Sequence, residues 1–350
     1  MGELEIERHD SLMGLIYSTL AGKGLTNNSV FDLSHESNRD DSFYPFYHLR
    51  NKFREHGIEL NTLDLSETSK ITFGLDFDVH PSYTSASRYL LMLETPQIRI
   101  ENGVTENLNK YHKVFTWNDS LVDDKKYIKI NFPNRIKTTP PDGFSERPIF
   151  CCLISSNRAL TVSDPRDLYK ERVKAIRWFE KNAPADFNLY GSGWNIPAAK
   201  TGIIGAIERR AWNTISKIIP VDHFPSYCGR VNTKYETLKN TRFSICYENV
   251  RDLPGYITEK IFDCFFAGCI PVYWGADNVS DYIPEDCFID RRKFKDMPEL
   301  YNHLKSMTNE EFVKYQERIS SFLRSTAAIP FGTHFFTETI VNTIVEDLGI

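Results

Sequence analysis

Three patterns that would each assign a function class are missing from this chain. None of its seven cysteines falls in a CxxC or other metal-ligand spacing, so neither a zinc site nor a disulfide framework is predicted. The formal charge of -5 lacks the basic excess of a nucleic-acid binder. No GxGxxG follows a predicted strand, which disfavours a nicotinamide-dependent dehydrogenase. Any site for an anion must therefore be local.

Long apolar runs are missing as well. No window approaches the ~18 consecutive apolar residues of a membrane-spanning helix. The N-terminus carries Glu3, Glu5 and Glu7 where a secretory signal would be basic. The use of cysteine fits a reducing compartment. We therefore expect a cytoplasmic protein, and peripheral contact with a membrane stays open.

What the chain does contain is enough apolar material for two domains. Its 350 residues exceed the size at which one hydrophobic core keeps growing, and 41% of them are hydrophobic. The clearest break is the segment 138–148, where three prolines and a glycine separate two apolar stretches. The boundary is therefore placed there, between residues 143 and 144.

Strands and helices alternate after this break. Residues 149–154 and 187–190 are predicted as strands, with a helix over 168–181 between them. Before the break, the predicted elements are strands at 71–77, 89–93 and 113–117 and a helix at 45–56 that ends at Gly57. The alternation favours a doubly wound parallel sheet.

The run 243–275 contains most of the functional information. Residues 243–247 and 270–274 are apolar strands, and 257–267 has apolar residues at helical spacing, so the run is one βαβ unit. Its loop brings Thr258, Glu259 and Lys260 to the start of the helix, where unpaired N–H groups and the helix dipole favour an anion. A phosphorylated ligand is predicted.

This run resembles the donor-binding motif of the α-1,3-fucosyltransferases, glycosyltransferase family 10. The family motif reads roughly Phe-Glu-Asn, a short spacer and Tyr-(Ile/Val)-Thr-Glu-Lys-(Ile/Leu)-Phe-Asp, and it matches residues 247–249 and 256–263, with 267–275 trailing. The resemblance implies a GT-B fold, an α/β architecture of two Rossmann-like domains facing across a cleft. The alternation of strands and helices independently permits this fold.

The resemblance also implies how the two halves divide their work. Residues 1–143 would be the acceptor-binding Rossmann-like domain, and residues 144–333 the domain that binds the GDP-sugar donor. Residues 334–350 include apolar side chains at i, i+4 spacing and predict an amphipathic helix. In GT-B proteins such a helix often crosses back to the N-terminal domain.

The implied activity is an inverting transfer of L-fucose from GDP-L-fucose to a hydroxyl of an oligosaccharide or glycoconjugate acceptor. The expected linkage is α-1,3 to N-acetylglucosamine or glucose, with GDP-L-fucose as co-substrate and no metal or other cofactor. Two alternatives stay open, a donor with another deoxysugar and a catalytically silent nucleotide-sugar-binding protein. Golgi-type family members carry an N-terminal anchor. We therefore expect a bacterial enzyme, or a Golgi-lumen enzyme if this chain is a piece of a longer protein.

The motif suggests donor-binding roles for several side chains. Lys260 stands in the first turn of its helix, where the dipole disfavours a lysine unless the lysine serves an anion. The resemblance assigns Lys260 to the diphosphate and Glu259 to sugar hydroxyls, although Glu259 could also be a favourable first-turn charge. The other expected donor-binding residues of this run are Tyr256, Thr258, Glu248 and Asn249.

A second group is expected on the first strand and helix of the donor half. Arg172 shares a helix face with apolar residues, so its charge needs a partner or must reach past the core to solvent. Family 10 enzymes have a diphosphate-binding arginine on this helix, after a Ser-Asn strand end, and Ser156, Asn157 and Arg172 match that arrangement. Arg177 is the rival.

A sugar transfer with inversion needs a base for the acceptor hydroxyl, and a carboxylate is the usual solution. Glu94 ends an apolar strand of the N-terminal half, where family members carry their proposed base, so Glu94 is the candidate catalytic residue. The pair Asp76 and Asp78 has the Asp-x-Asp form of a divalent metal site, but a solvent-facing strand explains it equally well. The acidic loop 38–41 is interpreted as solvated rather than as an acceptor contact.

Overall fold

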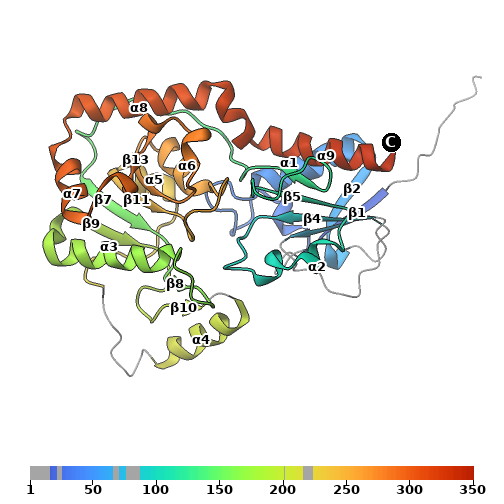
Figure 1. Cartoon of the computed structure of the whole chain (residues 1–350), viewed down its shortest axis with the longest axis horizontal. Helices are drawn as coiled ribbons and strands as arrows, with labels where there is room; N and C mark the ends of the chain where they lie inside the picture. Colours follow the sequence, from blue (N-terminus) through green and yellow to red (C-terminus); the bar gives the residue numbers. More distant parts are fainter. Residues whose placement is uncertain (1–15, 22–25, 66–70, 76–86, 201, 216–223) are drawn as a thin grey trace, which may run out of the picture.

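A computed structural model describes residues 16–21, 26–65, 71–75, 87–200, 202–215 and 224–350. Within these ranges the chain forms two parallel β-sheets with helices around them, one from the N-terminal half and one from the C-terminal half (Figure 1). These two sheets form the GT-B architecture that the resemblance implies.

The N-terminal sheet has six parallel strands in the order β2-β1-β3-β4-β5-β6. They are β1 (Ile16–Ala21), β2 (Ile58–Thr62), β3 (Ile71–Leu75), β4 (Ser87–Met92), β5 (Lys113–Thr116) and β6 (Tyr127–Lys129). The helices α1 (Tyr44–Glu55) and α2 (Thr105–Leu108) belong to this half. Buried residues of β2, β4 and β5 share one core with α1.

The C-terminal sheet has five parallel strands in the order β13-β12-β11-β7-β9. They are β7 (Ile149–Ile154), β9 (Phe187–Tyr190), β11 (Thr241–Tyr247), β12 (Ile270–Trp274) and β13 (Ile289–Asp290). A separate pair consists of β8 (Arg158–Ala159) and β10 (Ala199–Lys200). The helices are α3 (Leu168–Asn182), α4 (Gly202–Ile215), α5 (Lys234–Lys239), α6 (Glu259–Phe266), α7 (Met297–Ser306) and α8 (Asn309–Arg324).

Helices cover both faces of the C-terminal sheet because successive strand residues point to opposite faces. Cys151 and Leu153 of β7 pack in one core with the apolar face of α3. Cys152, between them, packs in the other core with α6. The strand is buried on both sides, which explains its uninterrupted apolar sequence.

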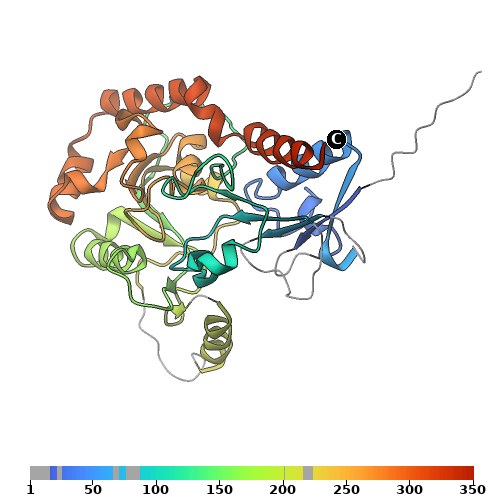
Figure 2. The ribbon, with the colours of Figure 1, turned by 45° about the vertical axis from the view of Figure 1, so that its right-hand side comes forward.

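The last helix, α9 (Thr333–Leu348), lies against the N-terminal half (Figures 1 and 2). Phe336, Ile340 and Ile344 of α9 are buried in the same core as Leu49 and Phe53 of α1. The long helix α8 runs along the C-terminal half, and a short 3₁₀ segment, Thr326–Phe331, joins it to α9. The first described strand, β1, and the last helix, α9, therefore lie in the same half of the molecule.

Most predicted elements are present, with ends that differ by a few residues. The helix expected over 257–267 begins later, at Glu259, because Thr258 acts as its N-cap. The strand expected over 71–77 is described only to Leu75, and Asp76 and Asp78 lie outside the described residues. The limits of the domains, 1–143, 144–333 and 334–350, stay a prediction.

Candidate active site

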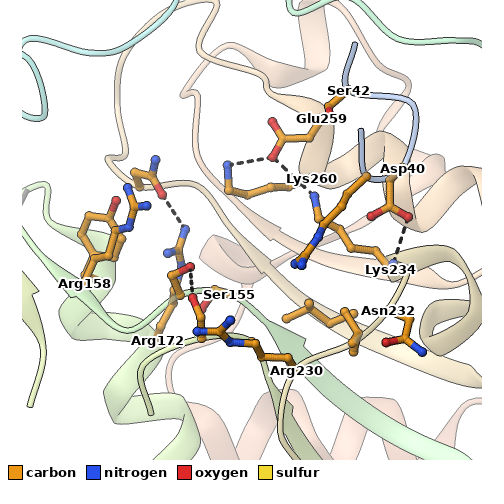
Figure 3. Close-up of a pocket in the computed structure, with 18 residues that line it drawn as sticks. Asp40, Ser42, Ser155, Arg158, Arg172, Arg230, Asn232, Lys234, Glu259 and Lys260 are labelled. Carbon is orange, nitrogen blue, oxygen red and sulfur yellow. Dashed lines mark hydrogen bonds and ion pairs between the residues drawn. The ribbon is translucent and has the colours of Figure 1, made fainter. Parts of the chain in front are cut away.

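A cavity of about 540 Å³ opens at the carboxyl ends of β7 and β11 (Figure 3). The chain leaves β7 toward β9 on one side and later returns to β11 on the other, so these two strands flank the point where the strand order reverses. Ligands of open parallel sheets bind at such a point. Ile154 and Ser155 line the cavity from the end of β7, and Asn249 lines it from the loop after β11.

The cavity is strongly basic although the chain as a whole is acidic. Two carboxylates line it, Asp40 and Glu259, against six cationic side chains: Arg39, Arg158, Arg172, Arg230, Lys234 and Lys260. Within the described part of the chain, the guanidinium groups of Arg39, Arg158 and Arg230 form no ion pair. This surplus of positive charge suits an anionic ligand of the size of a nucleoside diphosphate.

Lys260 is held in place by groups at the start of α6. Its Nζ donates to Thr258 Oγ1 at 2.8 Å and lies 3.1 Å from Glu248 Oε2 and 3.8 Å from Glu259 Oε1. Burial by itself would lower the pKa of Lys260, but the charges of Glu248 and Glu259 outweigh it and raise that pKa. Lys260 therefore stays charged at the cavity.

Glu248 lies behind the cavity rather than in its lining. Its side chain is fully buried and accepts hydrogen bonds from the Thr258 N–H at 2.8 Å and from Thr258 Oγ1. A buried carboxylate needs such partners, and here they are the N-cap of α6 and Lys260. In this geometry Glu248 and Thr258 position Lys260.

Arg172 has the partner that its place on an apolar helix face requires. Its Nη2 donates to the carbonyl of Tyr247 at 2.6 Å and to Asn249 Oδ1 at 3.0 Å. These bonds fix the guanidinium at the cavity wall. Arg177 instead pairs with Glu180 at 2.9 Å and does not line the cavity. The geometry thus favours Arg172 over its rival for the predicted anion contact.

Glu259 lies between two lysines. Its Oε1 is 3.8 Å from Lys260 Nζ and 3.7 Å from Lys234 Nζ, and Lys234 also pairs with Asp263 at 2.7 Å. Burial alone would raise the pKa of Glu259, but Lys260 and Lys234 lower it to about 2. Glu259 is therefore an ionised acceptor at neutral pH, as a contact to sugar hydroxyls requires.

The segment after β7 closes the other side of the cavity. Ser155 and Ser156 line it, and the Ser156 hydroxyl meets that of Ser192 at 2.8 Å. Asn157 is outside the lining, since its side-chain amide donates to the carbonyls of Gly193 and Ile196. Its position supports the loop that carries Ser192.

Only glycine fits at position 191 beside this segment. Gly191 has φ of +125°, and an added Cβ would lie 1.8 Å from the carbonyl oxygen of Ser155. The close approach brings the ends of β7 and β9 together at the cavity.

Besides Glu248, Thr258 and Asn157, two more predicted residues lie outside the cavity lining. Tyr256 is buried, and its ring packs on Trp117 and Phe132 of the N-terminal half, with centroids 4.7 Å and 5.9 Å away. Glu94 is partly buried two residues after β4. Burial raises the pKa of Tyr256, and the negative charge of Glu94 raises it further. The Glu94 carboxylate is therefore near Tyr256.

The loop 38–41, interpreted as solvated, is half-buried to exposed, and it also makes fixed contacts. Asp40 Oδ1 accepts the backbone N–H of Lys234 at 2.9 Å, and Asp41 pairs with Lys137 at 2.5 Å. Arg39, Asp40 and Ser42 all line the cavity, and Figure 3 shows Asp40 beside Lys234 of the C-terminal half.

Lys234 and Arg230 were not predicted, although the sequence contains signals for both. Thr233 and Glu236 have the spacing of a helix start, and the Thr233 side chain does cap α5. Lys234 is thus a lysine in the first turn of a helix, where the helix dipole disfavours positive charge, as is Lys260. Arg230 follows Gly229, whose φ of +95° turns the chain before α5.

The described ranges contain neither a candidate metal site nor a candidate membrane-spanning helix. Among those residues, acidic, histidine and cysteine side chains do not gather in threes as a metal site would need. Nor does any helix there combine the length and apolar character that crossing a bilayer requires.

Comparison with known proteins places the C-terminal half in a family. The sequence model described as "Glycosyltransferase family 10 (fucosyltransferase) C-term" matches residues 206–322. The α-(1,3)-fucosyltransferase FucT of Helicobacter pylori is 36% identical over 75 residues, which are 21% of this chain and 16% of that protein. The mouse 4-galactosyl-N-acetylglucosaminide 3-α-L-fucosyltransferase 9 is 31% identical over 131 residues, 35% of this chain and 34% of that protein. The matches thus span about a third or less of these relatives.

Solved structures match nearly the whole chain in fold. An α1,3-fucosyltransferase crystallised with GDP has a TM-score of 0.52 at 15% identity, covering 95% of this chain and 90% of that one. Anabaena HepE in complex with UDP and glucose has a TM-score of 0.51 at 11% identity, covering 95% and 100%. At such identities the likeness concerns the fold alone. Residues 206–322 thus carry the C-terminal domain of glycosyltransferase family 10, the fucosyltransferases.

Proposed function

We propose that this chain transfers L-fucose from GDP-L-fucose to a hydroxyl of a glycan acceptor, with inversion at the sugar carbon. The proposed linkage is α-1,3 to an N-acetylglucosamine or glucose residue. One observation carries the proposal, namely that the family 10 motif builds the wall of a basic cavity at the switch point of the C-terminal sheet. In this reading residues 144–333 bind the donor and residues 1–143 bind the acceptor.

The donor half would stabilise the departing GDP. Lys260 and Arg172 reach the cavity from the starts of α6 and α3, where they would neutralise the diphosphate as the bond to fucose breaks. Glu259 would accept hydrogen bonds from a sugar diol. Ser156 and Asn249 line the same cavity and would complete the donor contacts, while Glu248, Thr258, Asn157 and Tyr256 position these groups.

Glu94 is proposed as the base. The acceptor oxygen would attack the fucose carbon on the face opposite the diphosphate, and the carboxylate of Glu94 would take its proton. Glu94 is near Tyr256, which supports a position for the Glu94 carboxylate across the cleft from the loop between β11 and α6. The six cationic side chains of the cavity would supply the countercharge of the diphosphate, so we propose that no metal ion is required.

The decisive experiment is a glycan-array transfer assay with GDP-fucose, with and without a chelator. We expect fucose on a subset of N-acetyllactosamine or lipid-linked glycans and the same yield with the chelator. Calorimetric competition among GDP-sugars tests the donor, since tighter binding of another GDP-deoxysugar would change the assignment. Binding of GDP-fucose with no release of GDP on any glycan would identify a silent binding protein instead. Restoration of activity by manganese after chelation would refute metal independence.

A further inference from the structure

We propose that Asp40, a residue of the N-terminal half, positions the nucleotide site of the C-terminal half by capping α5. The cap would hold Lys234 where it fixes Glu259, so the contact between the halves would set the affinity for the donor. This inference rests on the proposed function for the identity of the ligand, and it adds a positioning residue that the family motif does not contain.

The segment 38–42, here named the Asp40 loop, has a fixed shape. Asn38 Oδ1 accepts the backbone N–H of Phe43 at 3.0 Å. Asp41 pairs with Lys137 at 2.5 Å and with Arg135 at 3.5 Å. Asp40 and Asp41 both have left-handed backbones, with φ of +51° and +61°. Non-glycine residues adopt this conformation only where the surroundings compensate its cost.

The carboxylate of Asp40 completes the start of a helix that lies 194 residues away in sequence. Its Oδ1 accepts the N–H of Lys234 at 2.9 Å and approaches the N–H of Tyr235 at 3.5 Å. Thr233 caps only the N–H of Glu236. The first N–H groups of a helix need acceptors, and here the other half of the molecule supplies one.

The capped helix places Lys234 in a chain of charges that ends at the cavity. Lys234 Nζ lies 2.7 Å from Asp263 Oδ2 and 3.7 Å from Glu259 Oε1. Glu259 in turn faces Lys260 at 3.8 Å. A shift of the first turn of α5 would move Lys234 away from Glu259 and change the direction of the proposed sugar-binding carboxylate. Figure 3 shows Asp40, Lys234, Glu259 and Lys260 in this succession along the cavity.

A second contact between the halves, defined by Trp117 and Asp119, does not involve α5. Asp119 accepts hydrogen bonds from Lys129, Asn278 and Tyr282. The two halves can therefore stay associated while the Asp40 contact opens. If GDP binds more tightly when Asp40 caps α5, bound GDP must in turn stabilise the Asp40 contact. The factor is the same in both directions because the two equilibria are linked.

The test compares the affinity of GDP for four proteins by titration calorimetry. Asp40→Gly removes the carboxylate at a φ that glycine adopts without strain, and we expect GDP to bind about fivefold to tenfold more weakly. Asp40→Asn keeps an oxygen that accepts the same N–H groups and should stay within about twofold of the wild type. The matched control is Asp32→Ala, whose carboxylate accepts hydrogen bonds from Ser34 in the same half.

A double-mutant cycle with Lys234→Ala tests the route of the effect. If Asp40 acts through Lys234, Asp40→Gly should cost little further affinity in the Lys234→Ala background. Should Asp40→Gly not fold, Asp40→Ala takes its place. Equal GDP affinity of wild type and Asp40→Gly, or additive losses in the cycle, would overturn the inference. A wild-type protein without affinity for GDP would instead refute the proposed function.

Discussion

Lys260 is the candidate site residue whose surroundings the structure defines most fully. It stands in the first turn of α6, where the dipole disfavours a cation, and three neighbours, Thr258, Glu248 and Glu259, hold its ammonium at the cavity. In the proposed mechanism, this ammonium would stabilise the negative charge that develops on the departing GDP in the transition state.

We expect Lys260→Ala to lower kcat by roughly 10²-fold or more, because stabilisation of the leaving group is typically the largest catalytic contribution. The steady-state rate of GDP release from GDP-fucose in the presence of an acceptor measures kcat. Lys174→Ala is the control, since Lys174 is 71% exposed on α3 and its ion pair among the described residues is with its helix neighbour Glu171 at 2.7 Å. Turnover that stays unchanged in Lys260→Ala would remove Lys260 from the proposed mechanism.

Substitution of Glu94 can distinguish donor binding from the chemical step of transfer. The Glu94→Gln change keeps the size of the side chain but removes its basicity, so transfer should fall by about 10²- to 10⁴-fold. Affinity for GDP-fucose should stay within about threefold, because Glu94 does not line the cavity and most of the proposed donor contacts come from the other half. Calorimetry and single-turnover assays measure the two quantities, with the exposed Glu101→Gln as control. An active Glu94→Gln protein would place the base elsewhere.

At the scale of elements, the loop between β11 and α6 is confined by the N-terminal half. Gly255 has φ of +81°, and an added Cβ would lie 2.3 Å from the carbonyl oxygen of Trp117. The Asp119 N–H also donates to the carbonyl of Pro254 at 3.3 Å. The loop that delivers Tyr256 and Thr258 is thus shaped by both halves.

This confinement predicts a difference between two glycine substitutions. Gly57→Ala places a side chain at φ of +70° with nothing within 4 Å, so it should cost only the backbone strain of about 1–2 kcal/mol. Gly255→Ala adds the collision with Trp117 to the same strain and should lower the midpoint of thermal unfolding considerably more. Equal midpoints for the two variants would show that the loop is free to move away from Trp117.

Much of the C-terminal half could be predicted from sequence, because its information is local. The βαβ unit follows from apolar periodicity, although its helix begins two residues later than predicted. The Asp40 contact could not be predicted, since its partners are 194 residues apart and no periodic pattern records which loop meets which helix. The buried position of Tyr256 depends likewise on Trp117, from the other half. Local patterns therefore located the donor motif but not the partners that hold it.

At the scale of the whole molecule, α9 ties the end of the chain to its beginning. Ile340 is fully buried in the core of the N-terminal half, together with Leu49, Phe53 and Ile58. The N-terminal core is thus incomplete without residues that follow the C-terminal half in sequence. This arrangement should make the stability of the N-terminal half depend on a helix that follows the C-terminal half.

Ile340→Ala should therefore destabilise the protein by about 2–5 kcal/mol, the usual cost of a cavity at a fully buried aliphatic side chain. Scanning calorimetry with and without GDP measures this change. GDP should stabilise the unfolding transition of the C-terminal half more than that of the N-terminal half, because most cavity residues come from the C-terminal half. The loss of stability in Ile340→Ala should appear in the transition that GDP stabilises less. Asn342→Ala, on the exposed face of α9, is the matched control and should leave both transitions in place. If Ile340→Ala lowered only the transition that GDP protects most, α9 would belong energetically to the donor half, and the division at residues 333 and 334 would have to be redrawn.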